Sequence, residues 1–238
     1  MPRLITELIL RALQLVRVGR LPPQPDARPR RIVLLRFGGI GDIVVLTGLV
    51  RTLKRLYPDC HVTLVTGAEG AAIAHANDDI DAVVETENLQ LENSPGRTLA
   101  NLRTMRRLAG AEPFDLAILT HSDINRLFCT LWLKARRKAG FDVNARGFDF
   151  ALTHAWPLYV LGHPLMASQA GLHLNDQFHA ILGAYLGHAV AASPPRLELR
   201  PEERAWADAW LAERGLARPI VALSPGGSDP IKHWPTGR

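Results

Sequence analysis

Residues Arg31–Asp42 have the sequence RIVLLRFGGIGD, and this stretch decides which fold the sequence predicts. Ile32–Arg36 is a short apolar run of the kind that forms a buried strand, and a glycine-rich segment follows it. From Asp42 to Tyr57 apolar residues recur at helical spacing, and Pro58 ends the pattern. The stretch therefore predicts a strand, a glycine-rich turn and a helix whose first turn carries a carboxylate.

Strand and helix patterns continue to alternate along the chain. Further strands are predicted at His61–Thr66, Ala82–Glu85 and Asp115–Leu119, and helices at Glu69–Ala76, Thr98–Ala109 and Ile124–Arg137. Alternation at this spacing predicts a doubly wound α/β fold, in which helices cover both faces of a parallel sheet. Ligands of such sheets bind beyond the carboxyl ends of the strands, and the turn at Gly38–Asp42 lies at that edge.

The pattern of a strand followed by a glycine-rich turn recurs near the C-terminus. Between the two occurrences we expect a strand at Phe148–Trp156, a helix at Leu174–Leu186, a linker at Ala191–Leu199 and a helix at Pro201–Arg214. Pro219–Leu223 is then predicted as a strand, and Ser224–Ser228 as a second glycine-rich turn. A second α/β domain therefore begins here, and the chain ends shortly afterwards.

Composition limits the classes of partner and cofactor. The 238 residues carry a formal net charge of +5, and arginine supplies most of the cations, which suits phosphate or carboxylate partners or reflects a genome rich in arginine codons. Cys60 and Cys129 are the only cysteines, so we expect a reducing compartment and neither a disulfide framework nor a zinc site. Aromatic residues do not alternate with the basic ones, which argues against nucleic acid.

The N-terminal residues 3–20 combine apolar residues at helical spacing with arginines. Such a basic amphipathic helix binds an anionic membrane surface or docks on protein, and the sequence leaves both alternatives open. The apolar runs of the chain are shorter than the ~18 residues of a membrane-spanning helix. Residues 21–29 form a proline-rich linker.

Asp42 has two interpretations from the residues alone. It caps the helix, by satisfying free N–H groups at the helix start, or it is a general base beside glycines that let a substrate approach the backbone. In the second turn Ser224, Gly226 and Gly227, with Lys232 after them, are suited to hold a phosphate, and an ordinary surface loop is the alternative. The histidines lack metal-type spacing, and most are expected to be structural or exposed.

Other nucleotide-binding motifs fit less well. Gly39 and Gly41 match the start of a dinucleotide fingerprint, but Val44 stands where its third glycine belongs. The chain also lacks the GxxxxGK[ST] motif of the P-loop. We therefore expect neither a nicotinamide nor a flavin cofactor, and no metal.

Taken together, the two turns resemble those of the family 9 glycosyltransferases, the lipopolysaccharide heptosyltransferases. The segments that carry the resemblance are RIVLLRFGGIGDIVVLTGLVRTLKRLYPDCHVTLVT (31–66), FDLAIL (114–119), KARRKAGFD (134–142), NDQFHAILGAYLG (175–187) and VALSPGGSDPIKHWP (221–235). The resemblance runs from about Arg31 to the C-terminus. It departs from the family pattern at Leu119–Ser122, which replaces an Asp-x-Gln-Gly-like stretch.

The resemblance implies a GT-B fold, in which two Rossmann-like domains face each other across a cleft. Residues 1–29 would form an N-terminal extension, 30–190 the acceptor-side domain, and 191–238 a linker with the incomplete start of the donor domain. Asp42 would be the catalytic base, with Arg36, Gly39 and Gly41 on the acceptor side. Ser224, Gly226, Gly227 and Lys232 would bind the donor phosphates.

By the same resemblance, the reaction is an inverting, metal-independent transfer from a nucleotide sugar, typically ADP-heptose, to a lipid A–core or related glycan. The location implied is the cytoplasm, with peripheral contact to the membrane through residues 1–20. The alternative is a non-catalytic Rossmann-like module that binds a membrane surface or a partner transferase, because a donor domain that ends at Arg238 lacks most of its nucleotide contacts.

Overall fold

The computed structural model describes residues 28–90, 92, 94–121, 126, 129–130, 132–142, 165–167, 171–216 and 219–223. The predictions for residues 1–20, for 148–156 and for the turn and lysine at 224–232 lie outside these residues. The chain divides into two compact units, Met1–Glu198 and Leu199–Arg238, which are described separately.

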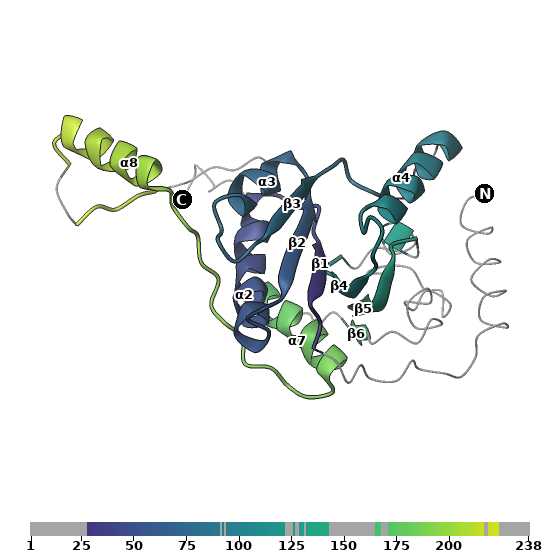
Figure 1. The fold of residues 1–238 in the computed structure, drawn as a ribbon. Helices are drawn as coiled ribbons and strands as arrows, with labels where there is room; N and C mark the ends of the chain where they lie inside the picture. The colour runs from purple at the N-terminus through teal and green to yellow at the C-terminus, as the bar shows by residue number, and fades with distance from the viewer. Residues whose placement is uncertain are drawn as a thin grey trace, which may run out of the picture. The chain divides into compact units, whose positions relative to one another are not determined.

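The first unit is built on a sheet of six parallel strands (Figure 1). The strands are β1 (Arg31–Leu35), β2 (His61–Thr66), β3 (Ala82–Glu85), β4 (Phe114–Leu119), β5 (Ala135–Asp142) and β6 (Leu165–Ala167). Their order is β3-β2-β1-β4-β5-β6, and every neighbouring pair is parallel. The predicted parallel α/β fold is therefore confirmed. The chain moves outward from β1 to β3 and then returns to the other side of β1, so the strand order reverses between β1 and β4.

Helices cover both faces of this sheet (Figure 1). They are α2 (Ile40–Leu56), α3 (Ala68–Ala74) and α7 (Leu174–Leu186) on one face and α4 (Pro95–Arg107) on the other. Successive side chains of β1 alternate between the faces: Ile32 packs with the α2 and α7 side, and Val33 packs with the α4 side. Because both faces are covered, β1 is apolar from Ile32 to Leu35, and each of these buried side chains contributes roughly 1.5–3 kcal/mol.

Two strands of the sheet, β5 and β6, were not predicted. The helix predicted at 124–137 is wrong at its C-terminal end, because Ala135 begins β5, which pairs with β4. The sequence does not reveal this strand because Arg137 and Lys138 carry charges and so interrupt its apolar pattern. In the structure both residues are nonetheless buried, at 7% and 4% exposed. Their long aliphatic stems allow such burial. Lys138 Nζ donates a hydrogen bond to the Thr130 carbonyl at 2.7 Å, and burial lowers the pKa of Lys138 to about 8.

A segment without helix or strand, residues 191–198, is bound to α2; we call it the strap. The Thr47 hydroxyl accepts a hydrogen bond from the Arg196 N–H at 2.8 Å. Gly48 allows the close approach, because a Cβ there would lie 2.7 Å from the Ser193 carbonyl oxygen. The strap is therefore part of the first unit, up to the point where this unit ends.

A buried polar cluster joins the strap to α2 and α7. His179 Nε2 lies 2.7 Å from the Thr52 hydroxyl and accepts from the Ser193 N–H at 3.3 Å. His179 Nδ1 lies 2.7 Å from the Asn175 carbonyl, which can only accept, so Nδ1 carries the proton of the neutral ring. Burial lowers the pKa of His179.

The second unit contains α8 (Pro201–Glu213), close to the helix predicted at 201–214. Pro201 occupies the first turn, and the Glu203 carboxylate accepts from the Arg200 N–H at 2.8 Å. The strand predicted at 219–223 is not formed, because within the described chain no strand lies beside it to pair its N–H and C=O groups. None of the helices that the structure describes combines the length and apolar character needed to cross a bilayer.

Candidate functional site

The glycine-rich turn lies where the strand order reverses, at the carboxyl ends of β1 and β4. The helix after the turn begins at Ile40, with Gly39 as its N-cap, so Asp42 is its third residue. Among the described residues the Asp42 carboxylate accepts no backbone hydrogen bond and instead binds Arg36. The interpretation of Asp42 as a helix cap is therefore wrong, because glycine takes the capping position and the carboxylate points back to the end of β1.

Arg36 holds the Asp42 carboxylate in place. Arg36 Nη2 lies 2.9 Å from Asp42 Oδ1, and Nη1 donates to the Thr120 carbonyl at 2.6 Å, at the end of β4. The guanidinium also lies 5.5 Å from the centre of the Phe178 ring of α7. The Arg36 side chain is 13% exposed, whereas that of Asp42 is 35% exposed. A mostly buried cation thus anchors a carboxylate that solvent still reaches.

The glycines of the turn differ in how much space a Cβ would find at each position. A Cβ on Gly38 would lie on the Asp42 carboxylate and 2.8 Å from the Asp42 Cβ. A Cβ on Gly39 would come within 3.9 Å of a Glu69 carboxylate oxygen, and one on Gly41 would have nothing within 4 Å. Gly38, which was not among the predicted site residues, is therefore the glycine that Asp42 requires. Gly41 borders open space that a ligand can enter.

His121 is a second residue of the site that the sequence did not single out. Its Nε2 accepts a hydrogen bond from the Phe37 N–H at 2.7 Å, and the two rings stack with centroids 5.8 Å apart and an angle of 13°. Because Nε2 accepts, the neutral ring carries its proton on Nδ1. His121 follows β4 directly and fixes the first residue of the turn. This position, directly after the strand that pairs with β1, is the signal that could have identified it.

The other predicted site residues lie outside the described part of the chain. Ser224, Gly226, Gly227 and Lys232 are among them, so their role in binding phosphate stays a prediction. Within the described residues, no group of three or more His, Cys, Asp or Glu side chains is placed to hold a metal ion.

The arrangement around Asp42 has the elements of general base catalysis. Its Oδ1 is engaged by Arg36, while Oδ2 has no hydrogen-bond partner among the described residues. A free carboxylate oxygen on a side chain that is 35% exposed can accept the proton of an incoming hydroxyl group. The site lies outside the carboxyl ends of the strands at the point of strand-order reversal, where Rossmann-like α/β proteins bind their ligands.

Comparison with known proteins identifies the class of this Rossmann-like fold. No protein-family model matches the chain, and no curated protein matches it. Among solved structures, the glycosyl transferase family 9 from Veillonella parvula DSM 2008 matches with a TM-score of 0.65 and 17% identity, over 88% of this chain and 58% of that one.

Two heptosyltransferases of E. coli match as well. The ADP-heptose lps heptosyltransferase II has a TM-score of 0.58 and 16% identity, over 86% of this chain and 57% of that one. The heptosyltransferase WaaC with ADP-2-deoxy-2-fluoro heptose has a TM-score of 0.54 and 15% identity, over 86% of this chain and 62% of that one. The chain therefore has a GT-B-type fold like that of the family 9 glycosyltransferases. It spans 57–62% of the length of these three structures.

Proposed function

We propose that this chain is the acceptor-side part of a glycosyltransferase of the heptosyltransferase type. The reaction is an inverting, metal-independent transfer of a heptose from ADP-heptose to a lipopolysaccharide core or related glycan. The fold supports this proposal, and so does the similarity to a structure described as holding an ADP-heptose analogue. The observation that carries it is the position of Asp42, a held carboxylate with one free oxygen at the ligand edge of the sheet.

Asp42 is the base in this proposal. Its Oδ2 takes the proton of the acceptor hydroxyl while the hydroxyl oxygen attacks the anomeric carbon of the sugar. The bond from that carbon to the phosphate oxygen of ADP breaks, and the electron pair leaves with ADP. Inversion follows because the new bond forms opposite to the bond that breaks. Ser224, Gly226, Gly227 and Lys232 stabilise the charge of the departing phosphates.

Arg36 and Gly38 are positioning residues in this reaction. Arg36 binds Oδ1 and is itself held by the Thr120 carbonyl, so the carboxylate presents Oδ2 in one orientation. Gly38 leaves the space in which that carboxylate lies. The backbone at Gly39 and Gly41 then forms the surface against which the acceptor approaches.

The location follows from the acceptor. A lipid A–core acceptor is anchored in the cytoplasmic membrane, so we place the chain in the cytoplasm, at the inner face of that membrane. The basic amphipathic sequence of residues 1–20 is suited to bind an anionic lipid surface.

Substitution of the base tests the proposal. Asp42→Asn keeps the size of the side chain but removes its capacity to accept a proton. We expect transfer from ADP-heptose to lipid A–core glycan, measured by ADP release and by the mass of the glycan product, to fall at least about 100-fold. Asp59→Asn is the matched control, because Asp59 is exposed beyond the opposite edge of the sheet, before β2.

Binding separates a chemical role from a structural one. Calorimetry should show that Asp42→Asn binds the acceptor glycan about as well as the unchanged chain, because the base touches only the reacting hydroxyl. Undiminished transfer by Asp42→Asn would exclude Asp42 as the base.

A further inference from the structure

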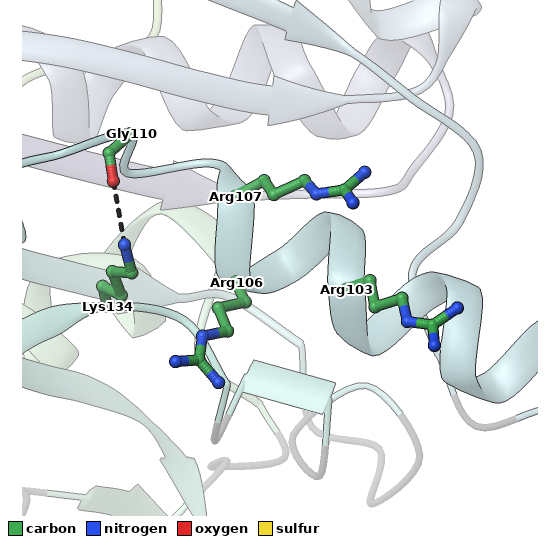
Figure 2. A pocket seen from close by; sticks show the side chains of 5 residues that line it. All are labelled: Arg103, Arg106, Arg107, Gly110 and Lys134. Carbon is green, nitrogen blue, oxygen red and sulfur yellow. Dashed lines mark hydrogen bonds between the residues drawn. The ribbon is translucent and has the colours of Figure 1, made fainter.

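A basic pocket lies at the edge of the sheet opposite to Asp42 (Figure 2). It has a volume of about 370 Å³ and is lined by Arg103, Arg106, Arg107, Gly110 and Lys134. Gly110 precedes β4 and Lys134 immediately precedes β5, so the pocket lies at the amino ends of these strands. Asp42 follows the carboxyl end of β1. The six residues of β4 are joined by five steps of about 3.3 Å, which separate the two edges by roughly 17 Å.

Within the part of the chain that the structure describes, the four cations of the pocket have no acidic partner. Among the described residues, none of the ion pairs within 4.0 Å includes Arg103, Arg106, Arg107 or Lys134. Lys134 Nζ donates to the Gly110 carbonyl at 2.9 Å, as Figure 2 shows, and this acceptor is neutral. The three arginine side chains extend from α4 in different directions, as like charges without a counter-ion do (Figure 2). The pocket therefore carries four positive charges that the described protein does not neutralise.

The wall of the pocket is fixed by another arginine. Arg31 donates to the carbonyl of Glu112 at 2.6 Å and to that of Ala109 at 3.2 Å, and its guanidinium lies 5.0 Å from the centre of the Phe114 ring. These contacts hold the loop between α4 and β4. Arg31 also adds a further positive charge beside this loop, whose one acidic residue is Glu112.

The end of α4 accounts for only some of these cations. Arg106 and Arg107 lie in the last turn of the helix, where free carbonyl groups favour positive charge. Arg103 lies one turn earlier, and Lys134 comes from a different element. A solvated helix face alone does not explain why cations from two elements line one hollow.

We propose that this pocket binds a ligand with at least two phosphate groups. A phosphate monoester carries between one and two negative charges near neutral pH, so two groups match the four cations. Guanidinium groups form paired hydrogen bonds with phosphate oxygens, which draws the arginine side chains together around the ligand. The volume lies within the range of about 300–1,000 Å³ that is typical of small-molecule sites. A soluble diphosphate and the phosphate headgroups of lipids share this chemistry.

Paired variants of equal charge test the proposal. The pocket variant is Arg103→Gln with Arg106→Gln, and the control is Arg97→Gln with Arg204→Gln, which removes two exposed arginines that do not line the pocket. Calorimetry at low ionic strength measures the binding of pyrophosphate and of inorganic phosphate. Flotation measures binding to vesicles with and without phosphatidylglycerol. Circular dichroism and the Tm verify that both variants are folded.

The unchanged chain should bind pyrophosphate more tightly than phosphate, and added salt should weaken the binding. The pocket variant should bind pyrophosphate at least about tenfold more weakly, since two charged hydrogen-bond donors are lost, and the control should change less than about twofold. If pyrophosphate does not bind but anionic vesicles do, the same difference between the variants in flotation identifies lipid headgroups as the ligand. Equal behaviour of the two variants in both assays would overturn the proposal. The result is independent of Asp42, because the pocket lies at the other edge of the sheet.

Discussion

Replacement of Gly38 by alanine should destabilise the first unit and displace the Asp42 carboxylate. The added Cβ would lie 2.8 Å from both the Cβ and the Cγ of Asp42, and the Cβ cannot move away by side-chain rotation. Gly38 does not have a positive φ, so alanine is tolerated by the backbone and the cost is steric. Overpacking of this kind costs about 1–3 kcal/mol, and loss of the partly exposed pair with the mostly buried Arg36 adds about 1 kcal/mol. We expect a loss of about 2–3 kcal/mol.

Gly41→Ala is the matched control, three residues away in the same turn. A Cβ at Gly41 meets nothing within 4 Å, and alanine is favoured over glycine in a helix by up to about 1 kcal/mol. Urea unfolding followed by circular dichroism should therefore separate the two variants by about 3 kcal/mol. With a slope of about 2 kcal/mol per molar urea, the midpoints should differ by more than about 1 M.

A double variant tests the cause of the effect. Asp42→Ala removes the carboxylate that the new Cβ would strike, so Gly38→Ala with Asp42→Ala should lose less stability than the sum of the two single variants. If Gly38→Ala and Gly41→Ala unfold at the same urea concentration, Asp42 does not lie over Gly38, and our account of the turn is refuted.

Two further predictions concern buried basic groups. Burial lowers the pKa of His179 below 6.5, so below that pH the unfolded chain binds a proton that the folded chain does not. The free energy of unfolding should therefore fall as the pH drops below 6.5. In urea titrations from about pH 5 to about pH 8, His179→Gln should show less of this fall. Burial lowers the pKa of Lys138 from 10.5 to about 8, so the free energy of unfolding should rise by up to about 3 kcal/mol as pH increases between these two values. Lys138→Met should lack that increase, and a rise of the same size in both proteins would contradict the assignment.

The sheet could be predicted from the sequence where burial leaves an uninterrupted apolar pattern. The strands β1 and β2 are covered on both faces; β1 is apolar after Arg31 and β2 is rich in β-branched residues, so their bounds are predicted within one residue. By contrast β5 contains Arg137 and Lys138, and the sequence does not reveal that their stems are buried between neighbouring layers. The segment 219–223 has the residues of a strand, but a strand also needs a partner, which a local pattern does not specify.

The candidate site could be located from the sequence, but its geometry could not. The turn after β1 predicted the position of Asp42, because glycines followed by an acid at the end of an apolar run are a local signal. The contacts of Arg36 with Thr120 and of Phe37 with His121 join residues 84 positions apart. They exist because β4 lies beside β1, and a single sequence does not show which side chains meet at that junction.

Hydrogen bonds attach the strap, a segment without helix or strand, to helix α2. Its backbone is bound to α2 at Arg196 and joined to α7 through Ser193, and the first compact unit ends at Glu198. The hydrogen bonds between Thr47 and Arg196 hold the strap to α2, the helix that carries Asp42, two residues before the first unit ends. The path of the chain out of this unit therefore depends on the hydroxyl of Thr47, a side chain on the same helix as the candidate base.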